Sequence, residues 1–163
     1  MKKEDPRPSI ETVSLRDVVA DDLPTLFEFQ LDPDANRMAA VVPRDWEAYI
    51  AHWTKILADP KLVTKVVLDG ERLVGQISMF QSDGQNCVGY WIAKEHWGRG
   101  LATRALELLL SEVPIRPLHA HAARDNVRSI RILEKCGFKL VGYDHSPASE
   151  RYLECEGANF VLS

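Results

Sequence analysis

Residues 95–106 read Glu95-His96-Trp97-Gly98-Arg99-Gly100-Leu101-Ala102-Thr103-Arg104-Ala105-Leu106, and this run joins a β-rich segment at residues 87–93 to an amphipathic segment. Because glycine has no Cβ, consecutive backbone amides around the two glycines can turn inward as a concave nest. The helix that follows adds unpaired amides and the positive end of its dipole. The run therefore predicts a strand, a tight turn and a helix whose junction binds an anionic cofactor.

Two nucleotide-binding motifs that also place glycines before a helix fit this run poorly. The chain contains no G-x-x-x-x-G-K-[ST] motif, and no lysine stands at the start of the helix to reach a γ-phosphate. The dinucleotide motif needs glycine or alanine where Thr103 stands, although Asp125 lies about where its ribose-binding acid is expected. No strand-helix-strand series opens the chain, as a doubly wound fold requires. A nicotinamide-dependent enzyme therefore ranks third, behind the two functions given at the end of this section.

A second motif follows a short apolar strand at residues 118–123. It reads Asp125-Asn126-Val127-Arg128-Ser129-Ile130-Arg131-Ile132-Leu133-Glu134-Lys135-Cys136-Gly137-Phe138, which is typical of a helix that has an N-cap and ends at glycine. G-x-G-x-A followed by N-x-x-S-x-x-x-L-E-K-x-G-F, with Gly89-Tyr90-Trp91 on the preceding strand, resembles the GNAT superfamily of acetyl-CoA-dependent N-acetyltransferases. Within it the motifs are most similar to the ribosomal-protein alanine N-acetyltransferase type.

The order of expected elements fits one domain over residues 1–163, with residues 1–11 as a loose tail. Strands are expected at residues 12–19, 63–68, 73–80, 87–93, 118–123, 138–143 and 151–154, and residues 159–162 could add another. Helices are expected from Asp21 to Leu31, from Pro43 to Asp59, from Leu101 to Val113 and from Asn126, with a break at Asp32-Pro33-Asp34. The resemblance implies an α+β, three-layer fold. It has a mixed, mostly antiparallel sheet of six or seven strands and about four helices.

Composition limits the partners of the chain. A formal net charge of −4 argues against a nucleic-acid module, and no apolar stretch reaches the roughly 20 residues of a membrane span. The three cysteines match neither a zinc site nor a disulfide framework, which favours reduced thiols in the cytoplasm. We expect no metal, no nucleic acid and no membrane, and either a monomer or a homodimer.

The resemblance implies where acetyl-CoA binds. The backbone amides of residues 97–103 are expected to hold the pyrophosphate, with the Arg99 side chain nearby. The pantetheine arm is expected to bond to strand amides at Trp91, Ile92 and Ala93. The predicted cofactor-binding residues are therefore Trp91, Ile92, Ala93, Trp97, Gly98, Arg99, Gly100, Leu101, Ala102, Thr103, Asn126 and Ser129.

The catalytic candidates are Ser129, His121 and Tyr90. The resemblance implies that Ser129 lies beside the cofactor sulfur, where it could relay a proton to the thiolate. Many relatives instead have tyrosine where Leu133 stands, and this departure leaves Ser129 as the candidate acid. Family members often carry a glutamate base where Cys87 stands, so the usual base is missing. His121 and His119 are expected to point to one face of their strand and could serve instead, although an inactive edge or core histidine is the more common case. Tyr90 lies on the strand before the glycines, where an aromatic is more often part of the core.

These features predict an enzyme that transfers acetyl from acetyl-CoA to a primary amine by direct attack in a ternary complex. The acceptor is expected to be a protein N-terminus or a small amine. The segments at residues 32–46 and 144–151 flank the reaction centre in the family and contain no recognisable acceptor motif. Because the usual glutamate and tyrosine are missing, an acyl-CoA-binding sensor without turnover is the alternative.

Overall fold

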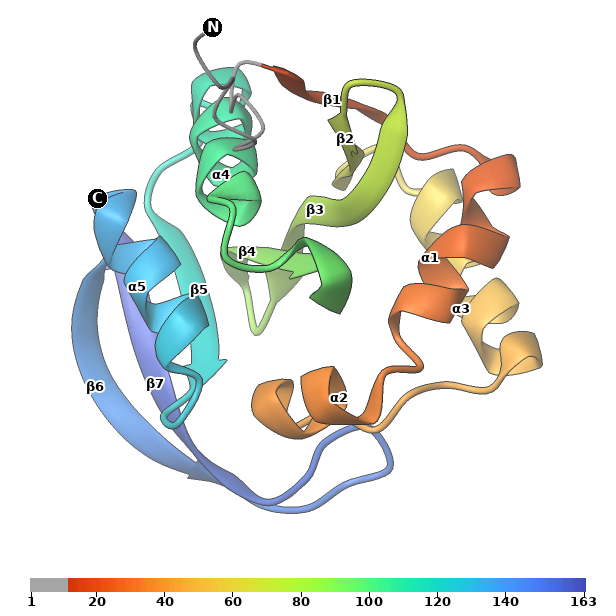
Figure 1. Cartoon of the computed structure of the whole chain (residues 1–163). Coiled ribbons are helices and arrows are strands. Elements are labelled where there is room, and N and C mark those ends of the chain that lie inside the picture. The colour runs from red at the N-terminus through yellow and green to blue at the C-terminus, as the bar shows by residue number, and fades with distance from the viewer. Residues whose placement is uncertain (1–11) are drawn as a thin grey trace, which may run out of the picture.

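The computed structural model describes residues 12–163, so the tail expected at residues 1–11 lies outside the described part. Its centre is a seven-stranded sheet in the order β1-β2-β3-β4-β5-β7-β6 (Figure 1). Every neighbouring pair in this sheet is antiparallel except β4 and β5. The strands are β1 (Val13–Asp17), β2 (Val63–Asp69), β3 (Arg72–Ser82), β4 (Gln85–Ile92), β5 (Leu118–Ala123), β6 (Lys139–Ser146) and β7 (Cys155–Leu162).

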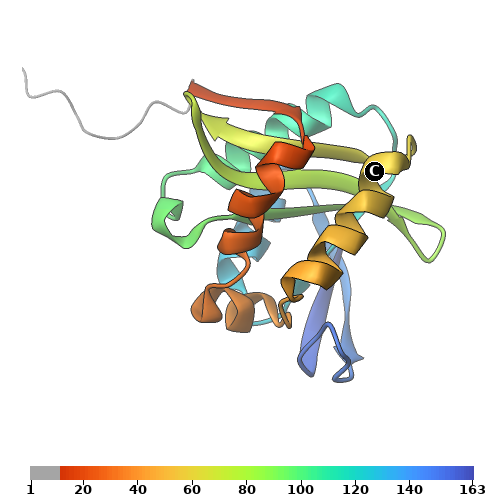
Figure 2. The same ribbon diagram turned by 90° about the vertical axis from the view of Figure 1, so that its right-hand side faces the viewer.

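Helices cover both faces of the sheet, which gives three layers (Figure 2). The helices of residues 12–163 are α1 (Leu23–Phe29), α2 (Pro33–Ala39), α3 (Trp46–Ala58), α4 (Leu101–Glu112) and α5 (Val127–Lys135), with short 3-10 helices η2 (Ala20–Asp22) and η3 (Lys94–His96). Figure 2 places α1 and α3 in front of the sheet and α4 behind it. The expected α+β fold with a mostly antiparallel mixed sheet is confirmed.

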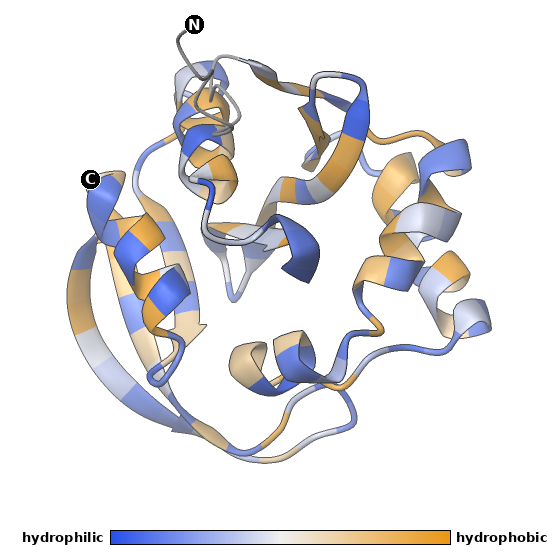
Figure 3. Ribbon diagram, viewed as in Figure 1, coloured by the Kyte–Doolittle hydropathy of each residue, from blue (hydrophilic) through white to orange (hydrophobic). Residues whose placement is uncertain are grey.

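Each face of the sheet has its own apolar core. The larger core joins α4 and α5 to the strands and is centred on fully buried side chains such as Leu106, Leu109 and Phe160. The smaller core joins α1 and α3 to β2 through Leu26, Trp53 and other buried residues. Figure 3 shows apolar residues along the central strands, while α5 alternates between polar and apolar residues. Helix α5 therefore has a polar face, which contributes to the site described below.

The expected break at residues 32–34 is confirmed, because α1 ends at Phe29, but these residues also begin a second helix, α2, which was not expected. The Asp32 carboxylate accepts hydrogen bonds from the amides of Asp34 and Ala35, both at 2.9 Å, and so caps the new helix. Pro33 occupies the first turn, where its missing N–H costs nothing. A proline after an aspartate is compatible with both the end of one helix and the start of the next, and the sequence pattern alone did not separate these cases.

The strand expected at residues 151–154 is wrong. The last strand of the sheet is β7, which begins at Cys155. Residues 151–153 instead pair with the segment that links α2 to α3: Tyr152 forms an isolated antiparallel bridge with Val41. Figure 1 shows the connection between β6 and β7 running beside this segment. Two chain segments distant in sequence therefore meet at the edge of the fold below α2.

In residues 12–163, no helix has both the length and the apolar character that crossing a membrane requires.

Candidate active site

The sheet opens between its two parallel strands. β4 and β5 form a single residue pair, Cys87 with His119. On its other edge, β4 stays paired with β3 as far as Ile92 opposite Gly75. The part of β4 after Cys87 therefore has one paired edge and one edge that faces the opening. This geometry allows an extended ligand to approach the free edge of a strand.

The direction of each amide in β4 follows from its pairing. The amide of Ala93 donates to the Val74 carbonyl at 2.9 Å, so it is already used on the β3 side. Alternate residues of an antiparallel strand bond to the same neighbour, which places Trp91 on the β3 side as well. The backbone of Ile92 faces the opening, because its carbonyl accepts the Trp97 indole N–H at 2.8 Å. By the same alternation Tyr90, rather than Trp91 or Ala93, presents the second amide there.

The turn after β4 has the conformation that its glycines predict. Gly98 and Gly100 have φ values of +79° and +75°, in the left-handed region that other residues rarely adopt. The first backbone amide of α4 that bonds back along the chain is that of Arg104, to the Gly100 carbonyl at 3.1 Å. The amides of Leu101, Ala102 and Thr103 precede it and have no acceptor inside the helix. The amide of Trp97 instead donates to the Lys94 carbonyl at 3.1 Å.

A cavity of about 340 Å³ lies between this turn, β4, α2 and α5. Its size and its mixed polar and apolar walls are typical of small-molecule sites. It contains ten of the twelve predicted cofactor-binding residues and omits Ala93 and Arg99. The lining is Ala35, Met38, Ala39, Tyr90, Trp91, Ile92, His96, Trp97, Gly98, Gly100, Leu101, Ala102, Thr103, Asn126, Arg128, Ser129, Arg131, Ile132 and Lys135.

Arg99 points away from this cavity. Its guanidinium forms an ion pair with Asp69 at 2.5 Å and donates to His96 Nδ1 at 3.0 Å. A hydrogen bond from the Thr12 hydroxyl, followed by the contact with Arg99, lowers the pKa of Asp69. Burial lowers the pKa of His96, which keeps its ring neutral and able to accept. The Arg99 side chain, expected beside the pyrophosphate, instead ties the glycine turn to the end of β2.

The cations that do line the cavity belong to α5. Arg128, Arg131 and Lys135 follow one another at spacings of three and four residues, so they share one face of the helix. The Arg128 guanidinium also lies 4.8 Å from the centre of the Trp97 ring, which connects α5 to the glycine turn. The sequence analysis missed these side chains. Their signal was present in the spacing of basic residues after Asn126, whose side-chain oxygen accepts the Ser129 amide at 3.3 Å.

Tyr90 and Ser129 meet inside the cavity. The Tyr90 hydroxyl lies 2.8 Å from Ser129 Oγ and 3.1 Å from the Ser129 carbonyl oxygen. Burial raises the pKa of Tyr90 well above its usual value, so the phenol stays protonated at neutral pH. Its single proton can go to the carbonyl, or to Oγ, which leaves the serine hydroxyl free to donate into the cavity. Tyr90 and Ser129 therefore form a short hydrogen-bonded chain, in which the phenol proton points either to the Ser129 carbonyl or to Ser129 Oγ.

His121 lies elsewhere. Leu118, Ala120 and Ala122 of β5 belong to the larger core, so the alternating His119 and His121 face the opposite side of the sheet. His121 is exposed, does not line the cavity, and places Nε2 3.5 Å from the Asp144 carboxylate. Gly157 of β7, which pairs with Ala123 and Asp144, leaves space for the ring, since a Cβ there would lie 2.0 Å from Nε2. The structure thus separates His121 from the Tyr90–Ser129 pair.

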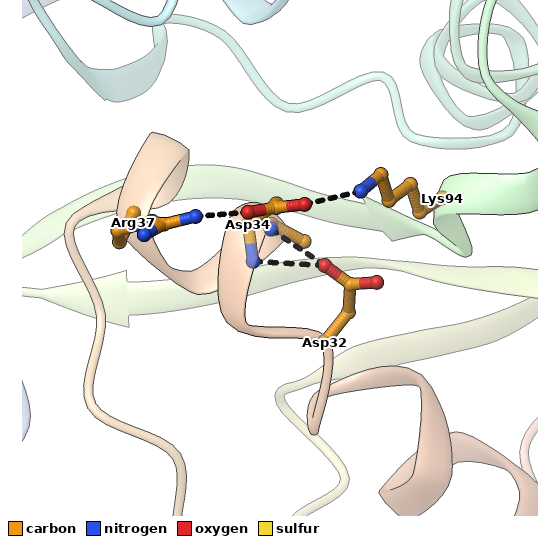
Figure 4. A network of polar contacts seen from close by, with 5 residues as sticks. Asp32, Asp34, Arg37 and Lys94 are labelled. Carbon is orange, nitrogen blue, oxygen red and sulfur yellow. Dashed lines mark hydrogen bonds and ion pairs between the residues drawn. The ribbon is translucent and has the colours of Figure 1, made fainter.

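One wall of the cavity is held by charges. α2 contributes Ala35, Met38 and Ala39 to the lining. The Asp34 carboxylate on the same helix pairs with Lys94 of η3 at 2.5 Å and with Arg37 (Figure 4). Lys94 first, and then Arg37, lower the pKa of Asp34, so this carboxylate is ionised at neutral pH. These contacts link α2 to the chain that enters the glycine turn.

Acetyl-CoA fits the groups that the cavity offers. Unpaired amides at the start of α4 and three cations of α5 suit phosphates, and the free edge of β4 suits an extended arm carrying amides. Metal binding has no comparable support: within residues 12–163, no three His, Cys, Asp or Glu side chains gather closely enough to hold a metal ion.

Comparison with known proteins agrees with this geometry. The profile of the acetyltransferase (GNAT) domain matches residues 12–139. The uncharacterized N-acetyltransferase p20 of Bacillus licheniformis is 21% identical over 159 residues, which span 88% of this chain and 89% of that protein. The putative ribosomal N-acetyltransferase YdaF of Bacillus subtilis is 32% identical over 99 residues, or 56% of this chain and 54% of that protein.

The fold is also found among solved structures. The spermidine N-acetyltransferase of Vibrio cholerae, in complex with CoA and spermine, superposes with a TM-score of 0.77 at 18% identity. The match covers 93% of this chain and 96% of that one. At this identity the likeness concerns the fold.

Proposed function

The chain belongs to the GNAT acetyltransferase family, and on this premise we propose that it transfers acetyl from acetyl-CoA to a primary amine by direct attack in a ternary complex. The observation that carries the proposal is a cavity shared by the free edge of β4, the glycine turn and the Tyr90–Ser129 pair. Bound acetyl-CoA supplies an activated acetyl thioester. The chain's own residues bind the phosphates, stabilise the developing charge and supply the proton.

The glycine turn and α5 hold the phosphates. The backbone amides of residues 98–103 donate hydrogen bonds to the diphosphate, and Arg128, Arg131 and Lys135 add positive charge along the same wall. Arg99 acts indirectly, because its ion pair with Asp69 fixes the turn that carries these amides. Removal of Arg99 should therefore alter loop geometry rather than a direct phosphate contact.

The middle of β4 stabilises the charge that develops during transfer. The amides of Tyr90 and Ile92 face the opening between the strands, where a backbone donor can bond to an oxygen that becomes negative. Ser129 donates a proton or a hydrogen bond to the departing sulfur, and Tyr90 in turn donates to Ser129 Oγ. This assignment uses the protonated state that burial of Tyr90 favours.

Direct attack by the amine is supported by the state of the nearby thiols. Burial raises the pKa of Cys136 to about 11, and its thiol lies 3.7 Å from the Thr103 carbonyl, to which it donates. Burial also raises the pKa of Cys87. A protonated thiol is a poor nucleophile, which disfavours an acyl-cysteine route.

The amine must lose a proton. The candidate general base is His121, which lies on the face of the sheet opposite the larger core. Its Nε2 lies 3.5 Å from the Asp144 carboxylate, which can orient the ring. His121→Asn should then reduce kcat/KM for the amine at neutral pH more than His119→Asn does. Equal and small effects of the two substitutions would remove His121 from the reaction.

The acceptor belongs to a class that the relatives suggest, either the N-terminus of a protein or a small amine. Three free cysteines support a reducing compartment such as the cytoplasm, with the protein acting as a monomer or a homodimer.

The experiment combines calorimetry with acetyl-CoA and an assay of thiol release over a panel of amines. We expect binding together with release that depends on the amine. Binding without release by any amine would favour an acyl-CoA sensor, and absence of binding would contradict both functions.

A further inference from the structure

Two arginines lie together where the chain after α2 meets the connection between β6 and β7. Arg44 precedes the N-cap of α3, and the Gln30 side chain fixes its backbone by donating to the Arg44 carbonyl at 2.9 Å. Arg151 lies in the other segment. The Val42 amide donates to the Arg151 carbonyl at 2.7 Å, and the Arg151 guanidinium donates back to the Val42 carbonyl.

Neither guanidinium has a carboxylate partner in the part of the chain that the structure describes. Among residues 12–163, the ion pairs within 4.0 Å include neither Arg44 nor Arg151. Both side chains are half-buried, and Arg151 Nε is buried without a hydrogen-bond partner in this part of the chain. Proteins normally pair charges that they withdraw from water, because an unpaired one is costly. Two unpaired guanidiniums at one place therefore leave donors and charge for a ligand.

The positive charge of this place acts on its neighbours. Burial lowers the pKa of Arg44, and the nearby Arg151 lowers it further. Burial, followed by both arginines, lowers the pKa of His52 on α3 to about 4, so the ring stays neutral at physiological pH. Lys55 contributes in the same direction. An anion would relieve this repulsion, whereas a polyamine would increase it.

The segments that carry the arginines adjoin α2, which lines the cavity, although neither arginine is part of the lining. Ala39 of α2 lines the cavity, and the next residue, Ala40, accepts the Leu153 amide at 2.9 Å. Arg151 is two residues from Leu153, or about 7 Å along an extended chain. The arginine side chain adds further reach. A molecule that enters the opening from below α2 can therefore contact the arginines while its amine lies in the cavity.

We propose that Arg44 and Arg151 bind a carboxylate or phosphate of the acceptor, so that the substrate is an amine that also carries an anionic group. The inference rests on the acetyltransferase function proposed above. Guanidinium groups suit such anions because their N–H donors form a planar fork that matches two oxygens. Arg151 uses one donor on Val42 and retains others.

The experiment compares matched acceptors, one member of each pair carrying an anionic group that the other lacks. The pairs are glutamic acid α-amide with glutamine α-amide, phosphoserine α-amide with serine α-amide, and C-amidated Ala-Glu with Ala-Gln. The first two pairs separate carboxylate from phosphate, and the third tests a peptide source. We expect kcat/KM to be at least about 10-fold higher for the anionic member of one pair or more, which is the effect of a charge-assisted hydrogen bond.

Variants assign the preference to the arginines. Arg44→Gln should reduce the ratio within the preferred pair toward one and leave KM for acetyl-CoA unchanged, and Arg44→Lys should restore part of it. Arg151→Gln is a less specific test, because the Arg151 side chain also donates to the Val42 carbonyl and so holds that segment in place. Arg72→Gln is the matched control, since Arg72 is exposed at the start of β3 and should leave the ratio intact.

Two results would overturn the inference. The first is acetylation of the neutral members with no preference for charge, which would leave the acetyltransferase function standing. The second is a preference that survives in Arg44→Gln. A measurement that needs no turnover adds a further check: with CoA saturating, inorganic phosphate and glutarate are used as probes in thermal unfolding. At least one of them should raise the melting temperature of wild type more than that of Arg44→Gln. Equal shifts in both proteins, or no shift in either, would contradict the site.

Discussion

The Tyr90 hydroxyl lies 2.8 Å from Ser129 Oγ, and the two residues come from a strand and a helix that both line the cavity. Because Tyr90 can donate to either oxygen of Ser129, the serine proton is held in one arrangement and free in the other. A pair of this kind can deliver a proton without a strongly acidic side chain.

Ser129→Ala and Tyr90→Phe should each reduce kcat by about 10- to 100-fold, at or just below the lower limit of the range for general acids, since neither side chain is strongly acidic. Steady-state kinetics should show KM for acetyl-CoA within about twofold of wild type, since Ser129→Ala removes the hydroxyl that acts on the sulfur and Tyr90→Phe removes the hydroxyl that donates to Ser129. Ser111→Ala, near the end of α4, is the control. A normal kcat in Ser129→Ala would remove the serine from proton transfer.

Gly98→Ala should weaken acetyl-CoA binding, because alanine at a φ of +79° costs about 1–2 kcal/mol and favours another turn conformation. Gly84 in the turn between β3 and β4 has a φ of +76°, and a Cβ at either glycine meets nothing within 4 Å. Gly84→Ala is therefore a control with matched strain. Chemical denaturation should give similar losses of stability, while calorimetry should give weaker binding in Gly98→Ala alone. Equal affinities in the two variants would place the diphosphate elsewhere.

Charge on α5 should contribute to affinity through the phosphates. Arg128→Gln and Arg131→Gln should each weaken acetyl-CoA binding about two- to fivefold, which matches the contribution of an exposed ion pair. The dependence of the dissociation constant on salt should become shallower in both variants. Arg124→Gln removes the same charge from a side chain that pairs with Glu156 and lies over the Tyr143 ring. An equal loss in that variant would indicate a general effect of net charge.

Asp69→Asn should destabilise the protein at pH 7 by about 1–3 kcal/mol, because its carboxylate holds Thr12 and Arg99. The folded state lowers the pKa of Asp69, so the stabilisation is present above the unfolded pKa, near 3.9, and is lost as the pH falls through the folded pKa. The difference in unfolding free energy between wild type and Asp69→Asn should therefore shrink below about pH 4. Glu71→Gln in the same hairpin is the control. A difference that stays constant with pH would contradict the role of the ionised carboxylate.

The features that were predicted correctly from the sequence are those that depend on residues close together in the chain. The positive φ values of Gly98 and Gly100 and the capping of α5 by Asn126 follow from side chains within a few positions. The partners of Arg99 and Tyr90 lie 30 and 39 residues away, and only the assembled sheet brings them together. Proximity in sequence suggested Arg99 as a phosphate ligand, whereas tertiary structure gives it Asp69.

The segments proposed to bind the acceptor were not predicted from the sequence, for the same reason. Residues 32–34 carry signals both for the end and for the start of a helix, so α2 was missed. The pairing of Val41 with Tyr152 joins two segments without a recognisable pattern, and it brings Arg44 and Arg151 to one place. A sequence read element by element contains no sign of such a contact, because each arginine by itself is an ordinary surface residue.

A crystal structure of the protein with coenzyme A tests the central claim most directly. The account predicts diphosphate oxygens within about 3 Å of backbone amides in residues 98–103, the hydrogen-bond distance for N–H donors, with the sulfur beside Ser129. Coenzyme A bound with its diphosphate away from this turn, or with the turn's amides directed outward, would contradict it.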